Sequence, residues 1–592
     1  MTSTKMTFRL LVSLLALTMV GCTAKKCTVT PQALSHLNFD VPGNIETSFD
    51  SGLIDDFPSV SAPAPRTNST ELPTDFWHMT LDEAVQIALS DATILRGLGA
   101  AVLQNPQGIP SSFAPAIIGT DPIFGTEASL SQFDTNVVSA LNFAKNDDVF
   151  NNPVLGGNAQ EVRDDLTTAT FGLSKITGLG TQLGLNTNVS HSQSDSPGIL
   201  FPHLWQTTLE ATISQPLLQG YGVEFNQIAG PNNQPGFRNA SGIAISRINL
   251  DVSKAQFYRS LNQMVREIVT AYWRLEQAYK NFEAVKSQRD SSLSIWNITK
   301  TKYDADLAGG ESDKESQARE QYFQFQGLLL ASLNGSNQTG QLGIYQAESD
   351  LRRLLNLPQS DSRMIRPSDE PHVVKLAFSW DDLSSSAQKR RIELIEQRLR
   401  IKQRELEYRA SRDFLLPRLD AVATYRNNGF GDDLAFGGSG RFSSALKDAV
   451  SNDHGEWEFG FQYNMTIGFR RAAAGVKNAE LSLRREKEVL REQTQQILHD
   501  LGSSVRSLEF SYGEADLAIQ RLTAAEETES ARTVGYESEV VSFDVLLDAQ
   551  QRLLDSRIQY FQVLNGLENA KASVLFESGR LLHELNVRII DP

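Results

Sequence analysis

Several stretches of the chain alternate apolar and polar residues with a period of two, and this alternation predicts β-strands. The clearest stretch is 457–467, where one face carries Trp457, Phe459, Phe461, Tyr463, Met465 and Ile467. Residues 208–214 and 182–190 alternate in the same way, and weaker candidates cover residues 135–143, 168–176 and 419–425. Each stretch has roughly the ten residues with which a tilted strand crosses a bilayer. The half-buried sheet of a soluble domain would show the same alternation, so this pattern alone leaves both possibilities open.

The longest predicted elements are helices. Between Gly242 and Gly309 lie 66 residues without glycine or proline, and as one continuous helix they would reach about 100 Å. Residues 372–416 contain neither glycine nor proline, and residues 418–591 contain no proline. Apolar residues recur along these segments at steps of three and four, as in Leu498, Leu501, Val505, Leu508 and Tyr512. This spacing is typical of coiled coils, and rods of this length exceed the core of a compact domain.

The predicted elements occur twice in the same order: a helix, strands, a long helix, a break and a second long helix. The first copy covers residues 80–357 and the second residues 379–588, with a linker at 358–378. The two breaks correspond at an offset of 231, since Asp313 falls against Asp544. A two-fold internal duplication explains this order. In the first copy, four prolines between residues 106 and 122 are expected to interrupt the helix that Thr80 caps.

The N-terminus has the features of a secretory signal peptide over residues 1–21. Its apolar run follows two basic residues and is too short to span a membrane as a helix. Gly21-Cys22 at its end resembles the lipobox of bacterial lipoproteins, which predicts acylation of Cys22; ordinary cleavage nearby with a free thiol is the alternative. Thr23 favours sorting to the outer membrane in such signals, and Cys27 receives no role. Residues 22–79 are rich in proline and serine and predict a tether, and residues 589–592 form a tail.

The amino-acid composition of the chain argues against several classes of function. The net charge of −16 over 592 residues argues against nucleic-acid binding, because phosphate contacts need a basic surface. Two cysteines are too few for a disulfide framework, a four-cysteine zinc site or an iron-sulfur cluster. The eight histidines show no pair at metal-ligand spacing, and no constellation of acid, base and nucleophile emerges. We therefore expect no enzyme activity, no cofactor and no bound metal.

The chain has too few strands to close a transmembrane barrel alone. Beyond the signal peptide no segment offers 18 consecutive apolar residues, so a mature chain that spans a membrane must do so with strands. A closed barrel needs at least about eight strands, whereas this chain supplies four clear strands and at most six. Because an open sheet edge cannot face lipid, several chains would have to share one barrel. The long helices would then continue its wall into the periplasm.

Four segments resemble, in order, segments of TolC-like outer-membrane efflux proteins. Residues 80–89 (TLDEAVQIAL) resemble the opening helix of that family, and residues 214–222 (SQPLLQGYG) resemble its strand-to-helix junction. Residues 414–419 (FLLPRL) are similar to its helix-to-strand junction in the second half, and residues 542–550 (SFDVLLDAQ) to its periplasmic helix turn. The resemblance covers roughly residues 80–588.

This resemblance implies an α+β fold and a homotrimer. Three chains would share one transmembrane β-barrel in the lipid of the cell outer membrane, and a long periplasmic α-helical coiled-coil barrel would continue it. Such ducts perform no chemistry and complete tripartite efflux pumps or type I secretion systems, joining a periplasmic adaptor protein and an inner-membrane transporter. Drugs, metal ions and secreted polypeptides all stay open as substrates. The competing interpretation is a lipid-anchored periplasmic coiled-coil scaffold or surface adhesin, which would leave the bilayer-length strands unexplained.

The chain departs from that family at two places. Glu539 stands where family members usually have glycine, which affects the geometry of the second helix turn. A possible turn at residues 177–181 would add two strands in the first half. Six strands per chain would make a wider barrel than is usual in the family, and the sequence leaves four and six open.

The resemblance places the periplasmic entrance and the adaptor contact at two helix turns. The residues expected there are Asp304, Asp306, Leu307, Gly309, Gly310, Glu311, Ser312 and Asp313 in the first half, and Glu537, Ser538, Glu539, Val540, Ser542 and Asp544 in the second. In a trimer, inward-pointing acids would form a ring that attracts cations; alternatively, they only solvate the turns or cap helices. Trp457, Phe459, Phe461 and Tyr463 are expected to face the membrane.

Overall fold

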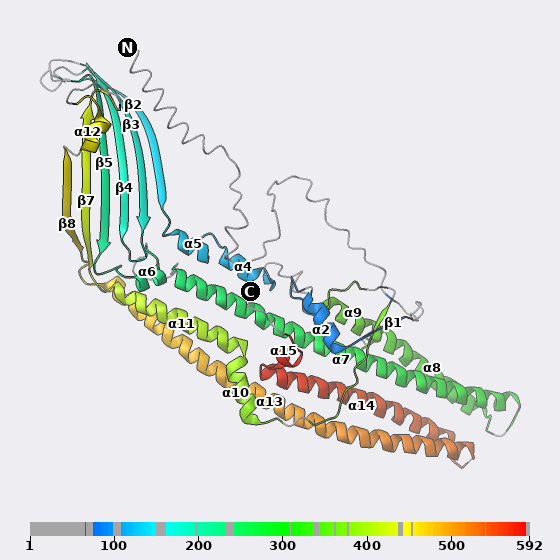
Figure 1. Ribbon diagram of the computed structural model, residues 1–592. Coiled ribbons are helices and arrows are strands. Elements are labelled where there is room, and N and C mark those ends of the chain that lie inside the picture. Colours follow the sequence, from blue (N-terminus) through cyan, green and yellow to red (C-terminus); the bar gives the residue numbers. More distant parts are fainter. Residues whose placement is uncertain are drawn as a thin grey trace.

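The computed structural model describes residues 66, 75–90, 92–98, 108–149, 161–195, 199, 201–231, 242–307, 309–336, 342–359, 361, 363–375, 378–435, 442–451, 454–538 and 540–587. Within them the chain forms an elongated molecule, with a sheet at one end and paired long helices at the other (Figure 1). The predicted signal peptide, Cys22 and Cys27 lie outside the described residues, as does Glu539.

One antiparallel sheet holds six strands in the order β2-β3-β4-β5-β7-β8. The strands are β2 (Asn136–Val149), β3 (Glu161–Ile176), β4 (Gln182–Ser194), β5 (His203–Pro216), β7 (Arg418–Gly431) and β8 (Gly455–Asn464). All six stretches with period-two alternation are therefore strands, and the weaker three are longer than the alternation indicates. The choice between four and six strands per chain is resolved as six.

The strand predicted at 457–467 ends earlier than its pattern suggests. β8 stops at Asn464, so Met465 and Ile467 lie beyond it. Gly468 and Phe469 follow with φ of 96° and 46°, the left-handed region of the backbone. These two residues lie between the end of β8 and the helix that begins at Arg470, and their backbone conformation is incompatible with a continued strand.

Four long helices form two hairpins, as the spacing predicts. The first hairpin joins α7 (Ile243–Asp304) to α8 (Ser312–Asn334), and the second joins α13 (Arg470–Glu537) to α14 (Phe543–Glu577). With 62 residues, α7 is about 93 Å long at 1.5 Å per residue. The helices after each break begin 231 residues apart, at Ser312 and Phe543, which is the offset of the predicted duplication.

The helical segments that precede the strands differ between the two halves. In the second half α10 (Trp380–Arg390) leads into the continuous α11 (Ile392–Asp413). In the first half α2 (Leu81–Ser90) is followed by the short helices α4 (Ala114–Gly119) and α5 (Thr126–Ser131). The prolines of this region account for the interruption, because proline removes a backbone donor and clashes with the preceding turn. Thr80 caps α2 as predicted, since its Oγ1 accepts the N–H of Glu83 at 3.2 Å.

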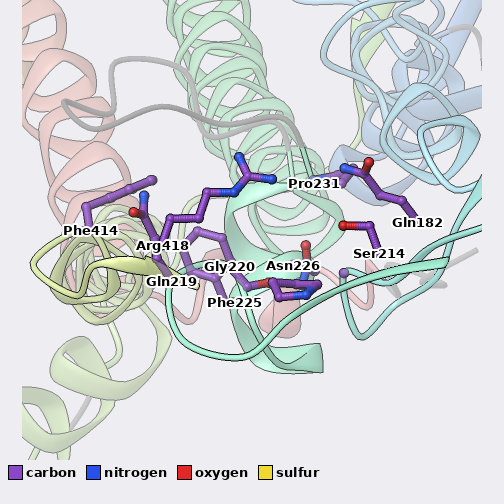
Figure 2. A pocket seen from close by; sticks show the side chains of 11 residues that line it. Gln182, Ser214, Gln219, Gly220, Phe225, Asn226, Pro231, Phe414 and Arg418 are labelled. Carbon is purple, nitrogen blue, oxygen red and sulfur yellow. The ribbon is translucent and has the colours of Figure 1, made fainter. Parts of the chain in front are cut away.

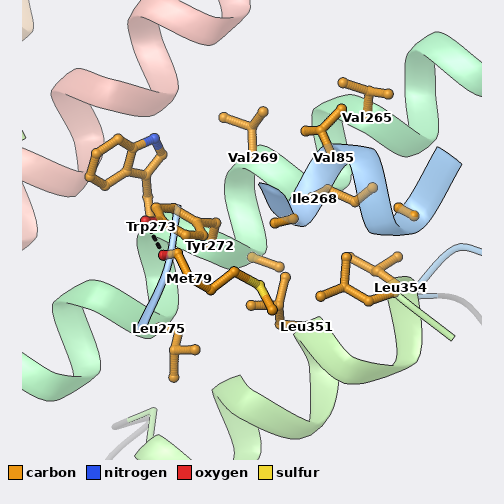
Figure 3. Packing of buried hydrophobic residues seen from close by; sticks show 14 of the residues in the cluster. Met79, Val85, Val265, Ile268, Val269, Tyr272, Trp273, Leu275, Leu351 and Leu354 are labelled. Atoms are coloured by element: carbon orange, nitrogen blue, oxygen red, sulfur yellow. Dashed lines mark hydrogen bonds between the residues drawn. The ribbon is translucent and has the colours of Figure 1, made fainter. Parts of the chain in front are cut away.

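The largest hydrophobic core lies at mid-length, where α7 meets the ends of both repeats (Figure 3). There β1 (Phe76–Met79) pairs in parallel with β6 (Met364–Pro367), and α9 (Ile344–Leu354) and α15 (Leu581–Glu584) pack beside them. Met79 is fully buried, and its carbonyl accepts the hydroxyl of Tyr272 at 3.0 Å. The last residues of the predicted tether and part of the predicted linker at 358–378 are therefore folded together.

Candidate functional site

The six-stranded sheet has one apolar face and one polar face. The strand register places Leu185, Ala211, Tyr425 and Trp457 in one row on the apolar face. On β8 the predicted aromatics Trp457, Phe459, Phe461 and Tyr463 all share this face, and each is at least 59% exposed. A sheet of this kind is typical of membrane strands, with apolar residues toward lipid and polar residues toward water. The contact of these aromatics with lipid stays a prediction.

A charged network lies on the polar face. Arg426 of β7 donates to Oε2 of Glu210 on β5 through Nε at 2.8 Å and Nη2 at 2.5 Å. Its Nη1 lies 3.7 Å from Oε2 of Glu456 on β8. One guanidinium therefore links three neighbouring strands and offsets part of the negative charge of the two carboxylates.

Replacing Arg426 by glutamine is expected to raise cation over anion permeability. Glu210 and Glu456 would lose their cationic partner. If three chains form a channel lined by this face, the substitution would change the charge of the channel by three. We expect the permeability ratio to rise by about two- to threefold, a change on the scale of the thermal energy. The measurement is the reversal potential across a planar bilayer in a salt gradient. Arg163→Gln, with the same change on the opposite face of the sheet, is the control and should leave the ratio unchanged.

A short helix marks the end of the apolar face that lies away from the long helices. α12 (Ala445–Ser451) packs against β7 and β5 near Trp205 and Leu434 (Figure 1). Gly429 has no side chain where the Ala445 carbonyl approaches β7, so a larger residue would push α12 away. The alternation along residues 419–425 contains no signal for this helix, because its contact depends on a glycine beyond that stretch.

The strands join the helices around a small polar cavity of about 70 Å³ (Figure 2). Its lining combines Gly180 of the β3–β4 turn and Gln182 at the start of β4, Gly220 and Asn226 from the segment after β5, Phe414 at the end of α11 and Arg418 at the start of β7. The volume is enough for a few water molecules. The cavity is too small to hold an organic ligand, and we call the region around it, where the sheet meets the helices, the joint.

Hydrogen bonds to the backbone and one half-buried carboxylate stabilise this joint. Asp413 accepts the N–H of Gly220 at 2.7 Å, and burial raises the pKa of Asp413. Asn226 donates to the carbonyls of Gly220 and Gly222 at 3.0 and 2.9 Å. Gly180, with φ of 87°, lies so close that a β-carbon would be 2.6 Å from the Gly220 carbonyl oxygen. Only glycine tolerates both the positive φ and the close approach of the Gly220 carbonyl.

The first predicted tip residues lie in the turn between α7 and α8, at the end of the molecule far from the sheet (Figure 1). Asp306 has φ of 55° and Gly309 has φ of 86°, and the N–H of Leu307 donates to the Lys302 carbonyl at 2.9 Å. Glu311 accepts a hydrogen bond from Lys314 at 2.8 Å, which lowers the pKa of Glu311. Asp304, Ser312 and Asp313 are exposed beside this turn.

The second turn has the same position between α13 and α14. The N–H groups of Val540 and Val541 both donate to the Gly535 carbonyl, at 2.9 and 3.1 Å. Glu537, Ser538, Ser542 and Asp544 are exposed around it. Two apolar side chains also point into solvent, since Leu307 is 59% and Val540 82% exposed. Both turns lie at the same end of the molecule, far from the sheet (Figure 1).

Neutralising acids at both turns tests whether they form a charged ring. With Asp306→Asn and Asp544→Asn, a trimer would lose six negative charges, and we expect single-channel conductance or cation selectivity to change by about twofold or more. The measurement is the current through planar bilayers at low and high salt, because screening should weaken the effect. Asp381→Asn with Asp516→Asn removes equal charge away from the turns and is the control. Identical currents in both double variants would contradict a ring at the entrance.

The described residues contain no group of three or more His, Cys, Asp or Glu that could hold a metal ion. None of the helices in the described ranges is both long and apolar enough to cross a membrane. Sequence reasoning missed the Arg426 network and the contact between Gly180 and Gly220, although it located the two segments, 177–181 and 214–222, that contain these glycines. The period-two pattern contains Glu210 on the polar side, but the partner strand and the register needed to place Arg426 beside it are not visible in one sequence.

Comparisons with known proteins reveal similarity at the level of the fold. Neither a protein-family model nor a curated protein sequence matches the chain. Among solved structures, the outer membrane protein VceC of Vibrio cholerae aligns with a TM-score of 0.52 and 12% identity, over 84% of this chain and 96% of that chain. The MtrE outer membrane channel of Neisseria gonorrhoeae gives 0.54 and 14%, over 88% and 98%. The CmeC outer membrane channel of Campylobacter jejuni gives 0.51 and 13%, over 92% and 94%.

The chain therefore has the α+β fold of these outer-membrane channels, and the resemblance to TolC-like proteins is confirmed for the fold. At 12–14% identity the similarity extends to the arrangement of sheet and helices. What these proteins transport or assemble with does not follow from it.

Proposed function

We propose that the chain is the outer-membrane channel-tunnel component of a tripartite efflux pump or type I secretion system. It would be a passive duct, without enzyme activity, for substrates that an inner-membrane transporter delivers through a periplasmic adaptor. One observation carries the proposal: a sheet with one apolar and one polar face is joined at one end to two long helical hairpins, in the fold of solved outer-membrane channels.

A homotrimer would provide the closed barrel that this function needs. The described sheet has six strands and two edges, so one chain leaves its outermost backbone groups without partners inside a bilayer. Exposed β8 aromatics would face lipid, and the network of Glu210, Arg426 and Glu456 would face the lumen. The helices would extend into the periplasm as a coiled-coil barrel.

The two helix turns would form the periplasmic entrance and receive the adaptor. Leu307 and Val540 support this assignment, because large apolar side chains exposed at a helix tip gain stability when a partner covers them. The acids around them would set the charge of the entrance. Acylation of Cys22 would add a lipid anchor on the tether that precedes residue 80.

Two measurements on protein extracted from outer membranes separate this function from a scaffold or adhesin. A channel should migrate as a trimer that heating converts to monomers, and it should give stepwise currents in planar bilayers. Release of the whole population by alkaline carbonate, with no conductance, would instead support the scaffold. Co-purification of an adaptor and a transporter with the native protein would identify the pathway.

A further inference from the structure

The sheet has more strands than connections to helices. Four strands meet the helical part of the chain: β2 follows α5, β5 leads through α6 (Val223–Ala229) to α7, β7 follows α11 and β8 leads to α13. The ends of β3 and β4 at this side are instead joined to each other by the turn at residues 177–181. β3 and β4 therefore widen the sheet by two strands in each chain without adding a helix to the helical part of the molecule.

We infer that three copies close a barrel of 18 strands, with β2 of one copy paired to β8 of the next. This inference rests on the proposed function, and it specifies the width of the pore. β2 and β8 are the two edges of the sheet. β2 begins at the helical side and β8 ends there, so the two strands run antiparallel when copies meet, as in membrane barrels. Closure also removes the edges that lipid cannot solvate.

The sequence of the two edges selects one register. If Phe461 lies opposite Ser139, then Phe459 lies opposite Leu141 and Tyr463 opposite Val137, so the apolar faces of both copies coincide. This register also matches the first residue of β2, Asn136, with the last residue of β8, Asn464. A shift of one residue would turn one strand's apolar side chains toward the lumen. A shift of two in one direction would place Lys145 opposite Trp457, inside the aromatic band. A shift of two in the other direction would leave Tyr463 and Asn464 of β8 beyond the first residue of β2.

The resulting barrel has ordinary geometry. A hydrogen-bonded row runs from Val137 on β2 to Trp457 on β8, and Trp457 is six residues from Tyr463, so the row shifts six residues per chain. With 3.3 Å per residue and 4.8 Å between strands, the strands tilt by about 35° and the backbone diameter is about 34 Å. Because diameter grows roughly linearly with strand number, this is about 1.5 times the width with four strands per chain.

The joint at the helical side fits this arrangement. The β3–β4 turn rests on the β5 exit, where the N–H of Gly222 donates to the Leu179 carbonyl at 3.2 Å and Gly180 packs against Gly220. α6 lies directly below and would fill the wall where the wider barrel meets fewer helices (Figure 1). The outer-membrane segment would then be open to bulky hydrated solutes, and the helical entrance would set the size limit.

Disulfide cross-linking tests the register in the full-length chain. In a Cys27→Ser background, Ser139→Cys with Phe461→Cys should give covalent dimers and trimers on oxidation, which a reductant reverses. Within one chain these positions lie at opposite edges of the sheet, separated by at least about 24 Å at 4.8 Å per strand spacing, so a bond joins two copies. Each single-cysteine variant should give no covalent dimer or trimer under the same oxidation. Cross-linking of Leu141→Cys with Phe461→Cys in place of the first pair would overturn the register.

Imaging of the wild-type trimer in lipid nanodiscs covers the case in which cysteine variants fail to assemble. Eighteen strands with β2 beside β8 would support the inference. A conducting trimer with twelve strands in its wall would overturn the inference and leave the proposed function intact. A monomer without a central passage would overturn both.

Discussion

Replacing Arg352 by methionine is expected to lower the free energy of unfolding by about 3 kcal/mol, because the buried Glu348 loses one of its two guanidinium partners and Asp361 loses its hydrogen bond to Arg352. The Arg352 side chain is fully buried and binds Oε1 of Glu348 at 2.8 Å and Oδ1 of Asp361 at 2.7 Å. It also donates to the carbonyls of Pro358 and Arg363, at 3.2 and 2.7 Å. Through these contacts Arg352, which lies on α9, binds the segment that connects the two repeats.

Denaturant unfolding of the detergent-solubilised protein, at matched protein concentration, measures this loss. Arg319→Met is the control, since Arg319 is half exposed on α8 and lies 3.8 Å from Glu315; surface pairs of this kind contribute about 0–1 kcal/mol. If Arg352→Met were as stable as Arg319→Met, Arg66 alone would be sufficient to offset the buried charge of Glu348.

The sequence does not reveal this buried network, although it contains both partners. Glu348 and Arg352 are four residues apart on a helix, which is the spacing of an ordinary surface ion pair. They are buried because distant segments cover them: Arg66 contributes a second guanidinium, 2.7 Å from Oε2 of Glu348, and the N–H of Ile365 donates to Oε1. Burial of this kind depends on chain segments that are far apart in sequence.

The sequence predicted well those features in which apolar residues recur at a regular spacing within one element. The period-two alternation in β8 and the steps of three and four in α7 show which side of each element is apolar, so strands, helices and the 231-residue offset could be predicted. Strand number was open because the turn at residues 177–181 is short and carries two glycines, a composition that also fits an irregular loop. The grouping of both helix turns at one end followed from the duplication. Which of their acids point toward an axis depends on neighbouring copies, and no single-chain pattern encodes it.

Glutamine in place of Glu276 is expected to stabilise the protein at pH 8 and to have little effect at pH 4.5. Glu276 is 8% exposed within α7, and burial raises its pKa to about 7 from 4.5. Lys280, whose Nζ lies 3.9 Å from Oε1, opposes this shift, while Glu283 and Glu370 add to it. Between pH 4.5 and 7 the folded chain holds a proton that the unfolded chain releases, so this group's contribution to stability falls as pH rises through that window.

The stability difference between Glu276→Gln and wild type should therefore grow by up to about 3 kcal/mol from pH 4.5 to pH 8, at 1.36 kcal/mol for each unit of pKa difference. Denaturant unfolding at a series of pH values measures it, and the difference should level off above pH 7, where the wild-type carboxylate is ionised in both states. Glu320→Gln, at an exposed position on α8, removes the same charge and should give a difference that does not depend on pH. A flat profile for Glu276→Gln as well would show that water or Lys280 solvates the carboxylate, and that the α7 core tolerates its charge.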